Sequence, residues 1–298
     1  METANPIFRF SPHPITASAF SHPRRERYDE TDPLVRHDYS RRLKATALYD
    51  AVRAIAEGEI VAAHHHRVFK EEECAKVYER AAKHHELTPY EGAPDLGHIG
   101  MSFFETSFGD AQRTSYFESA LGNIDRARAL WGDNRFPLDL VRSLLDEASP
   151  KGANLLRIDG RVCAAGLIRA QDDGAEIKHH VDHCGWDMTE SLEAQQVEAQ
   201  VSVVILLSKS ESGGDTTVYP ARLGKHHYDA RRLPEPFSYA VDESTLPSLH
   251  VTLRPEVGDL MMFDARHLHS VSKVGGGSRL SLSFFIGVCR DGRLVIFS

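Results

Sequence analysis

The stretches QVSVVILLSK (residues 200–209) and RLSLSFFIGV (residues 279–288) decide the fold class, because each is a long apolar run rich in Val, Ile, Leu or Phe. Residues of these types favour β-strands. Similar, shorter runs separated by turn residues fill the chain after residue 150: NLLRI (154–158), VCAAGLIRA (162–170), DTTVYP (215–220), LHVTL (249–253) and DLMMFDA (259–265). Successive strands without helical crossovers cannot form a parallel doubly wound sheet, so we predict an antiparallel sandwich or barrel over residues 151–298.

Helical periodicity precedes these strands. In EEECAKVYERAAKHH (residues 71–85) and FPLDLVRSLLDEA (residues 136–148), apolar residues recur at helical spacing, and the segment 109–131 is also predicted to be helical. The two apolar faces comprise Cys74, Val77, Tyr78, Ala81 and Ala82 in the first segment, and Leu138, Val141, Leu145 and Ala148 in the second. We therefore predict an α+β chain with a single domain over residues 1–298, in which mainly helical residues 41–150 pack on one outer face of the β-core.

Residues 1–40 are rich in Pro, Ser, His and charge and lack clear periodicity. We expect them to form an extended arm over the domain or to be partly disordered.

The composition limits the cellular compartments and the classes of partner that we expect for this protein. The N-terminus lacks a signal-peptide pattern, no apolar run approaches the roughly 18 residues of a membrane span, and the four cysteines form no CxxC pair. We expect a cytoplasmic protein with no membrane partner, present as a monomer or homodimer. A formal net charge of −8 without a basic stripe argues against nucleic acid, and it would repel an acidic carrier protein, so we expect a free small-molecule substrate.

The segment KHHVDHCGWD (residues 178–187) follows a strand-like run and carries a candidate metal site. His180 and Asp182 are two residues apart, so on a strand they point to the same face. A further histidine on a distant strand would complete the site, and both His267 and His269 are candidates that periodicity alone does not separate. Two imidazoles and one carboxylate leave three coordination positions open, as in non-haem iron(II) oxygenases.

An arginine lies ten residues after His269 and favours this histidine as the third ligand. Arg279 opens an apolar strand, where a cation is costly unless it meets an anion. A guanidinium beyond the metal would bind the far carboxylate of 2-oxoglutarate in a bidentate fork, with the Ser281 hydroxyl on the same face. Arg169 is a further candidate for binding the cosubstrate or an anionic substrate, and a surface salt bridge is its alternative role.

The joint pattern His180-x-Asp182, His269, Arg279-x-Ser281 resembles that of iron(II)/2-oxoglutarate-dependent oxygenases. The run SGGDTTVYP is similar to a strand that these enzymes often carry, and IKHHVDHCGWD, HSVSKV and DGRLVIFS look like their carrier-independent subgroup of hydroxylases and aliphatic halogenases. The resemblance implies a double-stranded β-helix, or jelly roll. It also implies Fe(II) with 2-oxoglutarate and dioxygen as cosubstrates.

The same resemblance suggests the reaction. Halogenases of the subgroup replace the metal-binding carboxylate by Gly or Ala, whereas Asp182 is present here. We therefore expect hydroxylation of an unactivated C–H bond of a free small molecule in specialised metabolite biosynthesis, with release of succinate and carbon dioxide. Desaturation, cyclisation, halogenation, zinc-dependent hydrolysis or a non-catalytic binding role for the jelly roll are the alternatives.

Other histidines and aromatic residues receive more ordinary interpretations. We expect His179 and His183 to be solvent-facing or supporting residues and His267 to be structural. The tracts His64–His66, His84–His85 and His226–His227 are interpreted as surface features able to bind nickel adventitiously. Trp186 would either contact the substrate or pack under a loop, and Thr217 and Tyr219 are candidates for lining the pocket. The loops around 85–110 and 220–245, together with the N-terminal helices, would shape that pocket.

Overall fold

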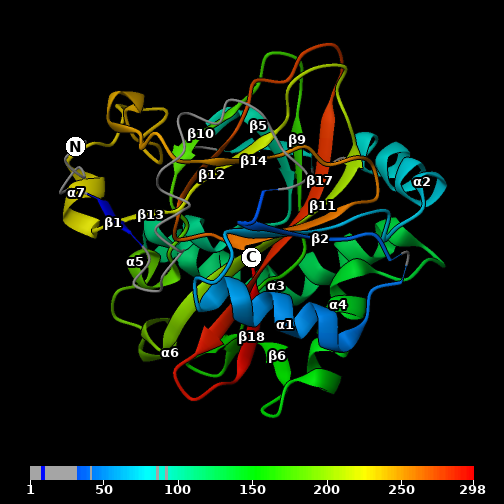
Figure 1. Cartoon of the computed structure of the whole chain (residues 1–298), viewed down its shortest axis with the longest axis horizontal. Helices are drawn as coiled ribbons and strands as arrows, with labels where there is room; N and C mark the ends of the chain where they lie inside the picture. Colours follow the sequence, from blue (N-terminus) through cyan, green and yellow to red (C-terminus); the bar gives the residue numbers. More distant parts are fainter. Residues whose placement is uncertain (1–7, 11–31, 41, 85–86, 91–92) are drawn as a thin grey trace.

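A ten-stranded sheet forms the centre of the computed structural model, which describes residues 8–10, 32–40, 42–84, 87–90 and 93–298 (Figure 1). Its main path runs β2-β3-β15-β11-β17-β9-β5-β4, with β18 paired to β17 and β6 paired to β18. The strands are β2 (Val35–Asp38), β3 (Ala62–His65), β4 (Thr88–Tyr90), β5 (Ala93–Ile99), β6 (Ala153–Leu155), β9 (Leu167–Gln171), β11 (Val197–Ser208), β15 (Leu260–Asp264), β17 (Arg279–Cys289) and β18 (Leu294–Phe297).

A second sheet has four antiparallel strands in the order β10-β16-β12-β14. These strands are β10 (Ile177–His180), β12 (Thr216–Tyr219), β14 (Val251–Leu253) and β16 (Leu268–Val271). Two small ladders pair β1 (Phe8–Phe10) with β13 (Ala221–Leu223), and β7 (Arg157–Ile158) with β8 (Arg161–Val162). The predicted antiparallel sandwich after residue 150 is therefore confirmed except at one place, where β6 pairs in parallel with β18.

Four long helices cover one face of the large sheet: α1 (Ala45–Ala56), α2 (Glu71–Ala82), α3 (Asp110–Trp131) and α4 (Pro137–Ala148) (Figure 1). The α+β class and the helical prediction for 109–131 are confirmed. In α2 the buried residues are Cys74, Val77 and Ala81, whereas Ala82 is exposed because it lies at the edge of the apolar face. Helix α1 was not predicted, although Leu48, Val52 and Ile55 follow a helical period and are buried.

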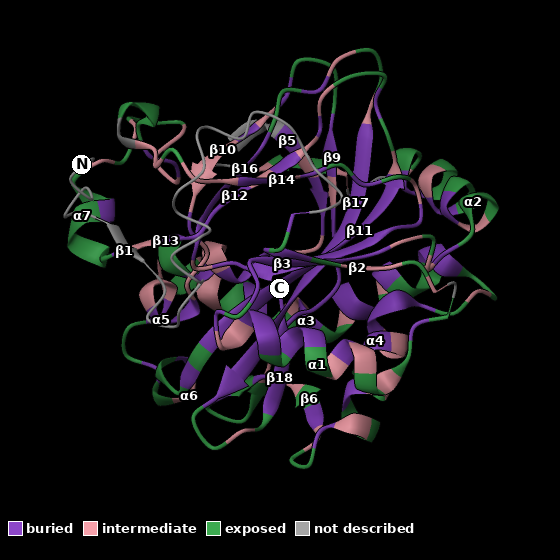
Figure 2. Cartoon of the chain, in the orientation of Figure 1, coloured by how far each residue is buried: buried purple, intermediate pink, exposed green. Residues whose placement is uncertain are grey.

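Side-chain alternation divides the long strands between the helices and the second sheet. In β11, Val201, Val203 and Ile205 pack into the helix-facing core, whereas Ser202 and Val204 line a pocket on the opposite face. In β17 the apolar residues Leu280, Leu282 and Phe284 face the helices, and the residues between them face the pocket. Figure 2 shows these central strands as the most continuously buried part of the molecule. The polar inner face therefore has a rigid apolar support.

The segment before residue 150 is mainly helical but also contains short strands. Residues 41–150 contribute β3, β4 and β5 to the large sheet as well as helices, because these short segments extend the sheet at its two edges. Within residues 1–40, β2 forms the edge strand beside β3, and most of the predicted arm lies outside the described residues. None of the helices that the structure describes has the length and apolar character needed to cross a bilayer.

Shorter helices lie in the connections: α5 (Cys184–Asp187), α6 (Leu192–Gln195), α7 (Lys225–Asp229) and the 3-10 helices η2 (Phe103–Phe108) and η3 (Glu243–Thr245). In η2, Ser102 and Glu105 form a capping box: the Ser102 amide donates to the Glu105 carboxylate over 2.7 Å. This cap fixes a helix that carries two phenylalanines of the pocket, Phe104 and Phe108.

Candidate metal centre and cosubstrate pocket

The second sheet brings three potential metal ligands together. In the ladder between β10 and β16, His180 is the direct partner of His269, and Asp182 follows β10 by two residues. The Asp182 Oδ2 atom lies 3.7 Å from His180 Nε2 and 3.4 Å from His269 Nε2. One donor atom from each residue lies within 4.8 Å of the other two.

Hydrogen bonds orient both imidazoles. His180 Nδ1 lies 2.8 Å from the Lys178 carbonyl oxygen, and His269 Nδ1 lies 2.9 Å from the His267 carbonyl oxygen. A carbonyl only accepts, so each Nδ1 is the donor and each Nε2 keeps its lone pair toward Asp182. The chain therefore presents two neutral nitrogen ligands and one carboxylate, a set that fits iron(II).

Local electrostatics favour the ligand form of these groups. Burial, reinforced by the neighbouring His269, lowers the pKa of His180 to about 3, so its imidazole is neutral near pH 7. Burial opposes ionisation of Asp182, but His180, His269 and Arg169 together hold the pKa of this carboxyl well below its usual range. Both groups are therefore ready to bind a cation without first losing a proton.

The structure distinguishes the two candidate distal histidines. His267 lies before β16, in the turn where its amide donates to the Asp264 carbonyl, so the two-residue periodicity of a strand does not apply to it. Its ring is buried with Nε2 3.8 Å from Asp264 Oδ2, and it is not part of the three-residue ligand cluster. His269 is the residue that faces His180.

Arg279 opens β17 and is buried at 3% exposure, as its position in an apolar strand predicted. Its Nε donates to the Gly214 carbonyl over 3.1 Å, and its Nη1 donates to Gln171 Oε1 over 2.8 Å and to Ser281 Oγ over 3.3 Å. Burial, together with the nearby Arg169, lowers the pKa of Arg279 to about 10, which keeps the guanidinium charged at neutral pH. Gln171 was not singled out in the sequence, because nothing in a strand residue's type reveals its partner across the sheet.

The glycine pair in SGGDTTVYP makes room for this arginine. Gly214 has φ +74°, and a Cβ atom there would lie 2.9 Å from Arg279 Cδ. Glycine therefore permits both the left-handed backbone and the close approach of the side chain.

Arg169 lies in the pocket wall, and the alternative of a surface salt bridge is wrong. It pairs in register with Ser281, and its Nε donates to the Tyr90 hydroxyl over 3.4 Å. Burial opposes its charge, but Tyr90 and Asp182 outweigh that effect and raise the pKa of Arg169. Because Arg169 interacts electrostatically with both Asp182 and Arg279, it bridges the ligand cluster and the anion-binding end of the pocket.

All six candidate site residues border one pocket between the two sheets, with a volume of about 1120 Å³ including its open mouth. The two predicted loop regions contribute Tyr90, Phe104 and Phe108 on one side and Tyr228 and Arg232 on the other. The four long helices do not shape the pocket, since they pack on the opposite face of the large sheet.

Short helix α5 and its N-cap supply one wall of the pocket, where Trp186 lies as one of its two interpretations expected, whereas His183 and Asp187 were not predicted to line the pocket. Trp186 stacks on His183 with ring centroids 4.6 Å apart, and both residues line the pocket beside Asp187. Burial and the charge of Asp182 raise the pKa of Asp187 to about 8. Aspartate in a four-residue helix after a metal-binding motif carries no sequence signal that it is half-buried.

The remaining polar and aromatic candidates have structural roles. Tyr219 packs in a core cluster and its hydroxyl lies 3.4 Å from His179 Nε2, and Thr217 contacts Thr252. It is the neighbouring Thr216 that lines the pocket, so the pocket assignment of Thr217 and Tyr219 is wrong. All four cysteines are free and buried.

Of the three histidine tracts, only His226–His227 is fully exposed among the residues that the structure describes, as a surface feature should be. His226 and His227 are exposed on α7, and His85 lies outside the described residues. The surface interpretation of His64–His66 is wrong, because β3 is buried within the large sheet and leaves His64 and His65 0% and 3% exposed.

Known proteins share this sequence pattern and fold. Residues 43–297 match the family described as "carrier-protein-independent halogenase WelO5". An L-gamma-glutamyl-L-propargylglycine hydroxylase of Streptantibioticus cattleyicolor is 28% identical over 212 residues, which cover 68% of this chain and 76% of that protein. An L-isoleucine 3(1)-dioxygenase of Pantoea ananatis is 27% identical over 146 residues, which cover 47% of this chain and 48% of that protein.

The crystal structure of an N-substituted L-amino acid dioxygenase of Burkholderia ambifaria superposes with a TM-score of 0.56 at 15% identity, covering 84% of this chain and 91% of that one. This likeness confirms the predicted jelly-roll fold.

Proposed function

Because the chain belongs to the carrier-protein-independent halogenase WelO5 family, and is therefore an iron(II)- and 2-oxoglutarate-dependent oxygenase, we propose that it hydroxylates a C–H bond of a free amino acid or amino-acid derivative. Asp182 is the observation that carries the choice of hydroxylation. Its carboxylate stands 3.4 Å from His269 Nε2, where it completes a set of three protein ligands.

The roles of the residues follow from their positions. His180, Asp182 and His269 would hold iron(II), which when bound supplies the redox chemistry that couples oxidation of 2-oxoglutarate to succinate and carbon dioxide with oxygenation of the substrate. Arg279 would bind the far carboxylate of 2-oxoglutarate in a charge-assisted fork, with the Ser281 hydroxyl beside it. Arg169 interacts with both Asp182 and Arg279, and it would hold a second anionic group of the cosubstrate or of the substrate.

The reaction outcome depends on what occupies the third ligand position. Halogenation would need a coordination position for halide beside the protein ligands. With Asp182 present, a halide would have to displace a protein ligand that is half-buried and ionised. Hydroxylation is therefore favoured over halogenation, despite the name of the family.

The pocket is suited to a small molecule with apolar and charged parts. Aromatic residues of η2, α5 and the 220–245 region, including Phe104, Trp186 and Tyr228, border it, and Asp187 offers a carboxyl group in the same wall. The pKa of Asp187, raised to about 8 by burial and by Asp182, would fall when a substrate ammonium group approaches. Named relatives act on amino acids or a γ-glutamyl amino acid, in line with such a contact.

The experiment is a screen of free amino acids and γ-glutamyl dipeptides for substrate-stimulated succinate release. Active compounds are then turned over under ¹⁸O₂ with bromide present and analysed by mass spectrometry. We expect one oxygen atom from dioxygen in the product and no bromine. A brominated product from the unmodified enzyme would contradict the proposed hydroxylation. In that case Asp182 would not be what excludes halide, so Asp182→Gly should not increase bromination. If Asp187 contacts an amine, Asp187→Asn should raise KM for the amine substrate and leave KM for 2-oxoglutarate unchanged.

A further inference from the structure

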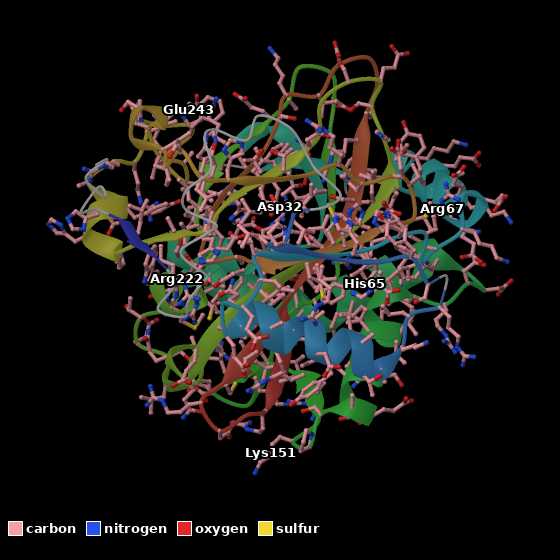
Figure 3. The ribbon with its side chains drawn as sticks, viewed as in Figure 1. Asp32, His65, Arg67, Lys151, Arg222 and Glu243 are labelled. Atoms are coloured by element: carbon pink, nitrogen blue, oxygen red, sulfur yellow. The ribbon has the colours of Figure 1, made fainter. Side chains whose placement is uncertain are left out.

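A second histidine cluster lies where the edge strand β2 meets β3. His37 of β2 pairs in parallel register with His64 of β3, and His66 directly follows β3. One nitrogen from each of the three imidazoles lies within 4.8 Å of the other two. None of these residues borders the cosubstrate pocket. His65 and Arg67, labelled in Figure 3, are the chain neighbours of His66 and mark the position of the cluster.

Strand alternation explains why these three side chains converge. Residues 64 and 66 point to one face of β3, and the pairing with His37 brings a third imidazole to that face. His65 points to the other face, where its Nδ1 lies 3.4 Å from Asp38 Oδ2. The rings of His64 and His66 are stacked with centroids 3.9 Å apart, and His37 Nδ1 lies 3.0 Å from His66 Nε2.

We propose that His37, His64 and His66 form a second metal site, separate from the catalytic centre, which binds zinc(II) and joins β2 to β3. Zinc binds imidazole nitrogen at about 2.0–2.1 Å, which in a tetrahedral site separates two nitrogen ligands by about 3.3 Å. The 3.0 Å between the nitrogens of His37 and His66 is close to that separation, so small side-chain rotations would admit the ion. Imidazole nitrogens suit zinc and its late transition-metal neighbours.

A buried carboxylate, that of Asp259, bonds His64 and also lies 3.7 Å, by its Oδ2 atom, from His66 Nδ1. Asp259 Oδ2 lies 2.8 Å from His64 Nε2, and the same carboxylate accepts the backbone N–H groups of Arg67 and Glu256 over 2.7 and 2.8 Å. A carboxylate that accepts two backbone N–H groups acts as an acceptor toward His64 as well. His64 Nε2 therefore carries the proton, and Nδ1 carries the lone pair that a metal requires.

That lone pair has no protein partner among the residues that the structure describes. His64 is 0% exposed, and its Nδ1 makes no hydrogen bond within the described part of the chain. A buried polar atom left unsatisfied destabilises the fold, and a bound cation would offset that cost. The contact with Asp259 alone would explain a structural role for His64, but not the convergence of His37 and His66 beside it.

The cluster is also reachable from solvent. His37 and His66 are half-buried rather than enclosed, and Tyr39 stacks on His66 with centroids 4.3 Å apart while remaining 60% exposed. An ion would thus enter past Tyr39 and reach the buried nitrogen of His64 last.

The test uses zinc(II) alone on a full-length background in which His180→Ala and His269→Ala remove the catalytic site. Equilibrium dialysis with metal analysis should find one zinc per chain. Adding His66→Asn or His37→Asn should weaken binding by more than the 10–100-fold typical of losing an outer-shell partner, since a direct ligand is lost. Zinc should raise the melting temperature of the background protein and leave that of the His66→Asn protein unchanged.

The matched control is His226→Asn with His227→Asn, which removes an exposed histidine pair of α7 and should leave zinc affinity unchanged. Circular dichroism and the metal-free melting temperature establish that each variant is folded, and His37 and His66 are chosen because they are only partly buried. Absence of zinc binding by the folded background protein would overturn the proposal. So would binding that survives both His37→Asn and His66→Asn, or binding that disappears with the α7 pair.

Discussion

Replacement of Arg279 by leucine should cripple binding of 2-oxoglutarate while leaving the fold intact. The side chain is 3% exposed, and its pKa is lowered to about 10. Because this pKa lies roughly 2.5 units above pH 7.5, more than about 99% of the Arg279 guanidinium groups are charged at that pH. Gln171, Ser281 and the Gly214 carbonyl hold Nε and Nη1, so the guanidinium is fixed before the cosubstrate arrives. Little side-chain entropy is then lost on binding.

The magnitude follows from the bonds that leucine removes. A fork to a carboxylate comprises two charge-assisted hydrogen bonds of about 1.5–3 kcal/mol each, so the loss is about 3–6 kcal/mol, or roughly 10²- to 10⁴-fold in affinity. Arg279→Lys keeps one point charge and should lose about half of this free energy.

The assay is the half-saturation concentration of 2-oxoglutarate in succinate release, with KM for the primary substrate measured in parallel. Arg222→Lys is the matched control, because Arg222 pairs with the buried Asp264 away from the pocket. An Arg279→Leu enzyme whose half-saturation by 2-oxoglutarate changes less than threefold would refute the assignment. If Arg169→Leu instead gave the large loss of affinity for 2-oxoglutarate, Arg169 would be the residue that binds the far carboxylate.

Two further predictions test the surroundings of the site. Gly214→Ala should raise KM for 2-oxoglutarate about tenfold, because a Cβ there lies 2.9 Å from Arg279 Cδ, whereas Gly160→Ala, with a similar φ of +75° and nothing within 4 Å, should leave KM unchanged. Equal effects of the two alanines would contradict the steric argument. Burial lowers the pKa of His267 from 6.5 to about 4. As pH falls, the unfolded chain therefore takes up a proton at this histidine before the folded chain does. Up to about 3 kcal/mol of the free energy of unfolding should be lost between pH 6.5 and 4. Urea unfolding of metal-free His267→Leu should lack this share of the pH dependence, and an unchanged slope would be the opposite result.

The sequence predicted the ligand cluster because its signal is local and joint. His180 and Asp182 share a strand end, and Arg279 stands out as a cation in an apolar strand, so each residue is unusual for its position. By contrast, Gln171 and Asp187 were missed, since their roles depend on partners that lie far away in the sequence. Arg279 reaches Gln171 across β9 and β17, and Asp187 is half-buried in the pocket wall beside residues of other segments such as Tyr228.

The errors in the prediction arise from the same cause. The polar tract His64–His66 has the composition of a surface loop, but β3 lies between β2 and β15 in the large sheet, and this pairing buries it. Likewise, counting in steps of two from His269 reaches His267, although the strand begins only at Leu268. Periodicity identifies a face only within an element, and element ends are where it is least reliable.

The alternation in the long strands has a consequence for how the site tolerates change. The apolar residues that stabilise the sheet, such as Val203 of β11 and Leu282 of β17, face the helices, whereas Ser202, Arg279 and Ser281 face the pocket. Each strand therefore carries stability on one face and chemistry on the other. Substitutions at inward positions remove few apolar contacts from the helix-facing core, so they should change cosubstrate and substrate binding far more than the free energy of unfolding. This separation is what makes the Arg279 comparison informative, because a loss of 2-oxoglutarate binding there does not have to pass through a loss of the fold.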